Sequence, residues 1–63
     1  MALKDIREER QLSQEELAKL SNVNQQTISR IENGVNVRFN TLIKLSEALD
    51  VSIDSLIKKR EPK

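Results

Sequence analysis

The sequence predicts an all-α fold: a compact domain of five helices. Its composition, 37% hydrophobic and 33% charged with one glycine, one proline and one aromatic residue, is typical of a soluble helical module. Apolar residues recur at helical spacing in five segments. Two of these segments meet at a three-residue turn, Asn22-Val23-Asn24. A domain of 63 residues has a marginal core unless its helices pack very efficiently.

The first two helices are predicted by apolar spacing and by a start signal. The first is expected over residues 2–10, with Leu3 and Ile6 facing inward. The second begins after Ser13, which is followed three residues later by Glu16. This S-x-x-E pattern is a capping box, and it places acidic residues near the positive end of the helix.

The second and third helices form the central unit of the domain. They are expected over residues 14–21 and 25–33, and Ile28 and Ile31 turn one face of the third helix inward. Asn22 suits a turn that needs a left-handed backbone, because its short polar side chain makes that conformation less costly. Two helical patterns joined in this way are typical of a helix-turn-helix unit.

Stop and start signals place the last two helices. Asn33-Gly34 ends the third helix, and the fourth is expected over residues 39–49. Its apolar stripe consists of Phe39, Leu42, Leu45 and Leu49. We therefore expect Phe39 in the core rather than as a platform for stacked bases. Ser52 caps a short fifth helix. The folded domain is expected over residues 1–58, followed by a basic, disordered tail over 59–63.

Several classes of function are disfavoured by what the sequence lacks. With neither cysteine nor histidine, it offers no disulfide framework and no usual transition-metal ligands, so we expect no metal and no cofactor. No catalytic constellation or phosphate-binding glycine loop is present, and we expect no enzymatic activity and no small-molecule ligand. Apolar runs of two or three residues form neither a signal-peptide core nor a membrane span, so the cytoplasm is the expected location.

The net charge of +1 is low for a nucleic-acid-binding domain, but the charges are unevenly distributed. The stretch 23–44 holds Arg30, Arg38 and Lys44 against a single acid, Glu32. The acidic side chains cluster elsewhere, at Glu8, Glu9, Glu15, Glu16, Glu47, Asp50 and Asp54. If Glu32 is paired inside the protein, the stretch 23–44 is positive.

The chain resembles the helix-turn-helix family of the lambdoid phage repressors and Cro proteins over nearly its whole length. The segments that carry this resemblance are LKDIREERQLSQEELA, NQQTISRIENG and TLIKLSEALDVSIDSL. The family has a five-helix repressor-like DNA-binding domain with the helix-turn-helix at helices 2 and 3, and many members have glycine where this chain has Gln11. The family pattern also places Arg7 against Glu32, which implies a largely buried ion pair.

Base recognition is expected at the outward face of the third helix. Gln25 and Gln26 open that helix, and a carboxamide can pair bidentately with N6 and N7 of adenine. Arg30 lies further along the helix, where it can reach O6 and N7 of guanine or a phosphate. Ser29 lies between these contacts and the core, and we assign it to a base edge, with a phosphate as the alternative.

Phosphate contacts are expected on both sides of this helix. The resemblance implies that Gln14 donates to a phosphate while steadying the first residue of the recognition helix. Asn24 is a helix cap that can also touch a phosphate, and Thr27 is assigned to a phosphate or a thymine methyl. The remaining residues in the expected phosphate-binding set are Asn33, Asn36, Arg38 and Asn40.

These residues predict a sequence-specific double-stranded DNA-binding transcription regulator, a repressor that inserts its third helix in the major groove of a pseudo-palindromic operator. Two copies are expected to form a weak homodimer, mainly on DNA. The alternative is a protein-binding module, an antitoxin or adaptor that docks a partner through exposed apolar residues. The candidates for that role are Leu20, Val35, Val37 and Ile57. A salt-dependent shift of duplex DNA would favour the first function.

Overall fold

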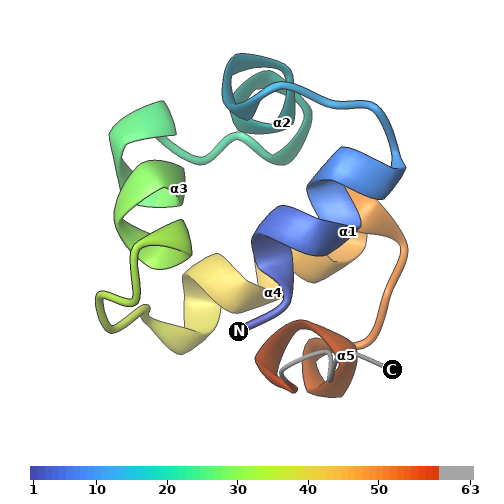
Figure 1. Ribbon diagram of the computed structural model, residues 1–63. Coiled ribbons are helices and arrows are strands. Elements are labelled where there is room, and N and C mark those ends of the chain that lie inside the picture. The colour runs from blue at the N-terminus through green and yellow to red at the C-terminus, as the bar shows by residue number, and fades with distance from the viewer. Residues whose placement is uncertain (59–63) are drawn as a thin grey trace.

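A computed structural model describes residues 1–58, which form five α-helices and no β-strand (Figure 1). In chain order they are α1 (Leu3–Glu9), α2 (Gln14–Ser21), α3 (Gln25–Glu32), α4 (Phe39–Leu49) and α5 (Ile53–Ile57). The predicted all-α fold is confirmed, with α2 and α3 as the helix-turn-helix pair. Segment 59–63, expected to be a disordered tail, lies outside the described residues. Within residues 1–58, no helix has the length and apolar character to cross a membrane.

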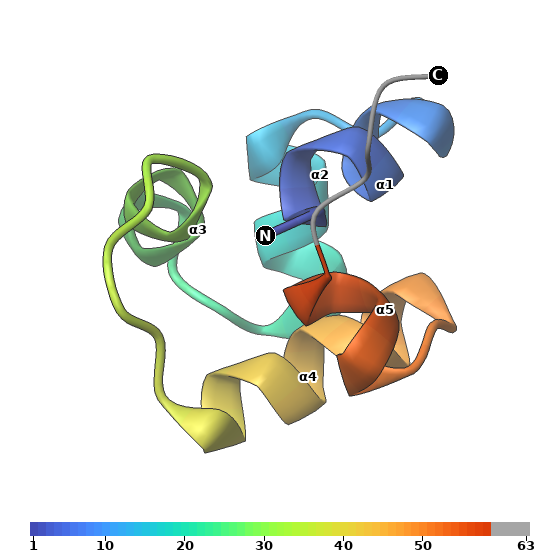
Figure 2. The same cartoon turned by 60° about the horizontal axis from the view of Figure 1, so that its bottom comes forward.

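Every helix contributes at least one aliphatic side chain to a single core. The core residues within the helices are Leu3, Ile6, Leu17, Ile28, Ile31, Leu42, Leu45, Leu49 and Leu56. Helix α4 packs against α2 and α5, while α1 packs against α3 and α5. In both ribbon views α3 and α5 lie on opposite sides of the molecule (Figures 1 and 2). The outer face of α3 is therefore left uncovered by the other helices.

Each of the first four helices is followed by a residue with a left-handed backbone. These residues are Gln11 (φ 58°), Asn22 (φ 57°), Gly34 (φ 89°) and Asp50 (φ 55°). After each one, the next backbone N–H returns to a carbonyl five residues earlier, as Val23 does to Ala18 at 3.2 Å. The left-handed conformation predicted for Asn22 and the stop signal at Gly34 are confirmed. Gln11 is the least suited of the four, because it has neither glycine's freedom nor a short polar side chain.

Hydrogen bonds from side chains satisfy several helix ends. The capping box is present: Ser13 Oγ accepts from the Glu16 backbone N–H at 3.0 Å, and Glu16 Oε1 accepts from the Ser13 N–H at 2.9 Å. The bond from the Ser13 N–H lowers the pKa of Glu16 below its usual value. Just after α1, Arg10 Nε donates to the Leu49 carbonyl at 2.9 Å. This places a cation at the negative end of α4.

Phe39 is a correction to the sequence analysis. It was expected in the core with the leucines of α4, but it is 64% exposed, whereas Leu45 and Leu49 are completely buried. At 100° per residue the three buried leucines share a narrow arc, and Phe39 lies about 90° from its centre. It also occupies the first turn, and helical side chains lean towards the N-terminus, which carries its ring away from the core.

The left-handed backbone at Gln11 makes Gln11→Gly a stabilising substitution. Glycine adopts a φ of 58° without the steric cost of a Cβ atom, and this gain exceeds its greater freedom in the unfolded chain. We expect the free energy of unfolding to rise by about 0.5–1 kcal/mol, measured by urea denaturation. Gln11→Ala is the control, because it keeps the Cβ and should stay close to the parent. Equal stability of the two variants would contradict the argument.

Candidate nucleic-acid interface

The outward face of α3 is set by its buried face. Ile28 is fully buried and Ile31 is 3% exposed, so the rotation of the helix about its own axis is determined by packing. Gln25, Gln26 and Arg30 consequently point away from the core and are exposed. The two residues between this face and the core, Thr27 and Ser29, are half-buried.

The three exposed side chains are free to bind a ligand. Within residues 1–58, Gln25, Gln26 and Arg30 have no hydrogen bond from their side chains to the rest of the protein. Asn24 differs: its Oδ1 accepts from the Gln26 backbone N–H at 2.7 Å, and it is the N-cap of α3. The capping role expected for Asn24 is confirmed. Its amide nitrogen remains available as a donor.

A groove of about 420 Å³ separates α3 from the beginning of α4. Its polar lining comes from α3 and from the segment that follows it, and consists of Thr27, Arg30, Asn36, Arg38 and Thr41. Two arginines therefore line one groove, which suits an anionic ligand. Sequence reasoning missed Thr41. The available signal was its position three residues after Arg38, which places both on one side of a helix.

The N-terminal end of α4 adds backbone donors beside this groove. Its N-cap is Arg38, and no side chain caps the helix there. The first turn of a helix has backbone N–H groups without intrahelical acceptors, and its dipole favours a negative charge. Asn33 at the end of α3, Asn36 in the connecting segment and Asn40 in the first turn of α4 are all exposed. The expected phosphate-binding residues after α3 thus lie near a polar helix end.

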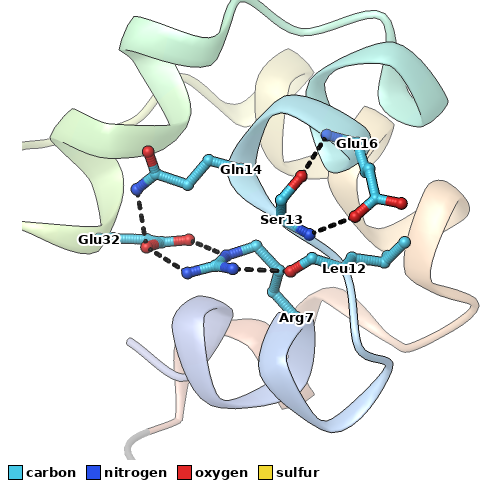
Figure 3. Close-up of polar contacts among 6 residues, drawn as sticks. All are labelled: Arg7, Leu12, Ser13, Gln14, Glu16 and Glu32. Atoms are coloured by element: carbon cyan, nitrogen blue, oxygen red, sulfur yellow. Dashed lines mark hydrogen bonds and ion pairs between the residues drawn. The ribbon is translucent and has the colours of Figure 1, made fainter.

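Arg7, Glu32 and Gln14 form a polar cluster at the opposite end of α3 from Gln25 (Figure 3). Arg7 Nε lies 2.7 Å from Glu32 Oε2, and Nη2 lies 3.2 Å from Oε1. The third donor, Nη1, bonds to the Leu12 carbonyl at 2.7 Å. The two charged side chains are 11% and 5% exposed, so the buried ion pair expected from the sequence is present. The hydrogen bond that the Arg7 guanidinium donates to Glu32 raises the pKa of Arg7.

Gln14 contacts a different part of α3 from the one expected. Its Nε2 donates to Glu32 Oε1 at 3.1 Å, and Glu32 is the last residue of α3. No hydrogen bond joins Gln14 to Gln25, the first residue of α3, among the described residues. The steadying interaction therefore bears on the C-terminal end of the helix. The phosphate contact expected for Gln14 stays a prediction.

The ion pair also affects the charge that the stretch 23–44 exposes to solvent. Glu32 is the one acidic residue in the stretch 23–44, and Arg7 neutralises it inside the fold. The basic residues Arg30, Arg38 and Lys44 in the same stretch are exposed or line the groove. The stretch 23–44 therefore exposes an excess of positive charge although the net charge of the chain is only +1.

The comparisons with known proteins agree with this geometry. A family model described as helix-turn-helix matches residues 3–56, which include nearly all of the five helices. Neither the curated proteins nor the solved structures contain a match to the chain.

The buried ion pair makes the Arg7 and Glu32 side chains interdependent. Glu32→Ala leaves a buried guanidinium without its counterion, and we expect a loss of about 3–5 kcal/mol in the free energy of unfolding. Arg7→Ala should cost a similar amount, and the double substitution much less than the sum. Glu15→Ala is the control, because the pair Glu15–Lys19 is exposed and 3.6 Å long and should contribute under about 1 kcal/mol. Thermal denaturation of these variants measures each effect. A loss as small as the control's at Glu32 would contradict a structural role for the pair.

Proposed function

The chain belongs to the helix-turn-helix family of the lambdoid repressors and Cro proteins, and we propose that it is a cytoplasmic, sequence-specific repressor that occupies double-stranded operator DNA. The family supports a DNA-binding regulator in general. One observation carries the finer proposal. Helix α3 presents two adjacent glutamines and Arg30 outward, with side chains that bond to nothing else in residues 1–58.

In the proposed complex, α3 lies in the major groove with its N-terminal end nearest the bases. Gln25 and Gln26 each pair with N6 and N7 of an adenine. Arg30, one and a half turns further along, reaches a guanine or a phosphate at the edge of the groove, and Ser29 contacts a base edge beside it. Buried Ile28 and Ile31 support this arrangement, because they hold the helix in one rotation about its axis.

The DNA backbone is proposed to run along both flanks of α3. Gln14 at the beginning of α2 and Asn24 at the beginning of α3 donate to phosphates near the two ends of α3. A further phosphate follows the groove between α3 and α4. The residues proposed to bind it are Thr27, Asn33, Asn36, Arg38 and Asn40. Two guanidinium groups and an uncapped helix N-terminus beside this groove favour a phosphate there.

Selection of binding sites from random duplexes tests this function most directly. A repressor of this kind should enrich a pseudo-palindromic sequence with two half-sites, and the enriched half-site should contain adenines opposite Gln25 and Gln26. Enrichment of no sequence, with duplex binding absent at low salt, would contradict the proposal. It would favour a protein-binding role for the same scaffold.

The two classes of contact predict opposite signatures. Gln25→Ala should weaken binding to the selected operator by roughly 1–3 kcal/mol and leave binding to unrelated duplexes nearly unchanged. Arg38→Ala should weaken all sequences alike and lower the slope of log affinity against log salt by about 0.9. Titration of both duplexes at several salt concentrations measures these effects.

Two matched controls accompany these variants. Gln11→Ala removes an equivalent amide from the turn between α1 and α2, and Lys4→Ala removes an exposed cation from α1. Both should bind each duplex as the parent does. If Gln25→Ala behaved like Gln11→Ala, Gln25 would not read a base.

Pairing of two copies on the operator is the remaining part of the proposal. Val35, Phe39 and Ile57 are more than half exposed, and they provide apolar surface near the beginning of α4 and the end of α5. A second groove of about 490 Å³ is lined in part by Met1, Val35 and Ile57. Contacts from so few side chains fall short of the roughly 1,000 Å² that a stable dimer requires.

We therefore expect the free protein to be mainly monomeric and to pair cooperatively on DNA. Half-sites should lie about one helical turn apart. Sedimentation at micromolar concentration measures the free state, and titration of duplexes with one and two half-sites measures cooperativity. A tight dimer in solution, or equal affinity per site for the two duplexes, is the opposite outcome.

A further inference from the structure

The contact between Gln14 and Glu32 determines how the Gln14 amide is oriented. Glu32 is ion-paired to Arg7, and a carboxylate offers only hydrogen-bond acceptors. The nitrogen of the Gln14 amide must therefore face Glu32, as it does at 3.1 Å from Oε1. The orientation of a side-chain amide is often ambiguous, but the chemistry of the partner removes that ambiguity here.

The same amide has a second N–H that makes no hydrogen bond within residues 1–58. A primary amide carries two donors on its nitrogen, and Gln14 makes one hydrogen bond from its side chain within residues 1–58. Gln14 is half-buried, so part of its amide remains open to solvent. A phosphate oxygen accepts but cannot donate, which makes it the complementary ligand for a free N–H.

Glu32 is well placed to hold this amide still. Two hydrogen bonds from Arg7 fix its carboxylate, and Arg7 is itself anchored to the Leu12 carbonyl (Figure 3). Glu32 Oε1 accepts from both Arg7 and Gln14, at 3.2 and 3.1 Å. A free glutamine side chain would have to be ordered when DNA binds. Here part of that ordering is already present in the free protein.

We propose that Glu32 is a positioning residue for DNA binding. It holds one N–H of Gln14 and so presents the other N–H to a phosphate, and the Gln14–Glu32 bond persists in the complex. Glu32 does not touch DNA in this arrangement, and it acts through Gln14. This inference rests on the proposed function, since it concerns the affinity for duplex DNA.

A double-mutant cycle on DNA affinity tests the proposal. The variants are Gln14→Ala, Glu32→Gln and the pair, measured with the selected operator at a low temperature where circular dichroism reports full folding. The cost of ordering one long side chain corresponds to about 2- to 10-fold in affinity. Glu32→Gln should weaken DNA binding when residue 14 is glutamine. This loss of affinity should exceed the loss measured in the Gln14→Ala background by the same factor.

The cycle removes the other effect of the substitution, which is a change of charge. Glu32→Gln also deletes a negative charge near DNA, but that effect is the same with or without Gln14. Glu8→Gln makes the same charge change at an exposed position of α1 whose side chain has no hydrogen bond to Gln14 or Glu32, and it should show no dependence on Gln14. If Glu32→Gln changed affinity by the same factor in both backgrounds, Glu32 would not act through Gln14 and the proposal would be wrong.

A second measurement needs no change at Glu32 and covers the case in which Glu32→Gln fails to fold. The two side-chain amide protons of Gln14 are identified by nuclear magnetic resonance, as the signals of the parent that are missing from the spectrum of Gln14→Ala. One should be shifted and protected from exchange in the free protein. On addition of operator, the second proton should shift while the first keeps its protection.

The possible outcomes separate this inference from the proposed function. Loss of protection at the first proton on DNA binding would mean that phosphate and Glu32 compete for Gln14, which overturns the positioning role alone. Failure of the parent to bind duplex DNA at any salt concentration would overturn both. Protection in the free protein would then show only that the Gln14–Glu32 bond exists.

Discussion

Arg7 and Glu32 connect parts of the chain that local structure leaves independent. Arg7 lies on α1 and reaches the carbonyl of Leu12 in the following turn, while Glu32 ends α3 and accepts from Gln14 at the beginning of α2. Burial of two charges is costly, and the cost is offset only when hydrogen bonds satisfy their polar atoms. In residues 1–58 no buried side-chain polar atom is left without a partner. The relative placement of the first three helices depends on this cluster.

The turns are the second constraint on helix placement. Four left-handed residues allow each helix to stop abruptly and the chain to leave in a new direction within a few residues. Each helix supplies only a few buried side chains to this small core, so the helices must be placed accurately for those side chains to pack. Asn22, Gly34 and Asp50 suit their positions, whereas Gln11 adopts the same conformation at some steric cost. Burial of apolar side chains from the following helices offsets that steric cost.

The basic residues of the proposed DNA face and most of the acidic residues lie in different segments of the chain. Exposed acids lie on α1, at the start of α2 and from the end of α4 into α5, and the one acid of the stretch 23–44 is neutralised by Arg7. The side that carries Arg30 and Arg38 is thereby positive without a strongly basic chain. A modest net charge limits non-specific attraction to DNA. Base contacts from Gln25 and Gln26 would then supply a larger share of the selectivity.

Local patterns were sufficient for the presence of five helices, for several of their ends and for the rotation of α3. The Ser13–Glu16 capping box, the left-handed Asn22 and the stop at Gly34 involve residues close together in the chain, so short-range chemistry decides them. The spacing of Ile28 and Ile31 likewise determines which side of α3 faces outward. The bond from Gln14 to Glu32 rather than Gln25 required the tertiary structure. Helical spacing could already have indicated the exposure of Phe39 and the position of Thr41 beside Arg38, but only the structure showed that Thr41 lines the groove. Periodicity gives the rotation of a helix about its own axis, but the position of its ends beside other helices depends on how the side chains of all five interlock.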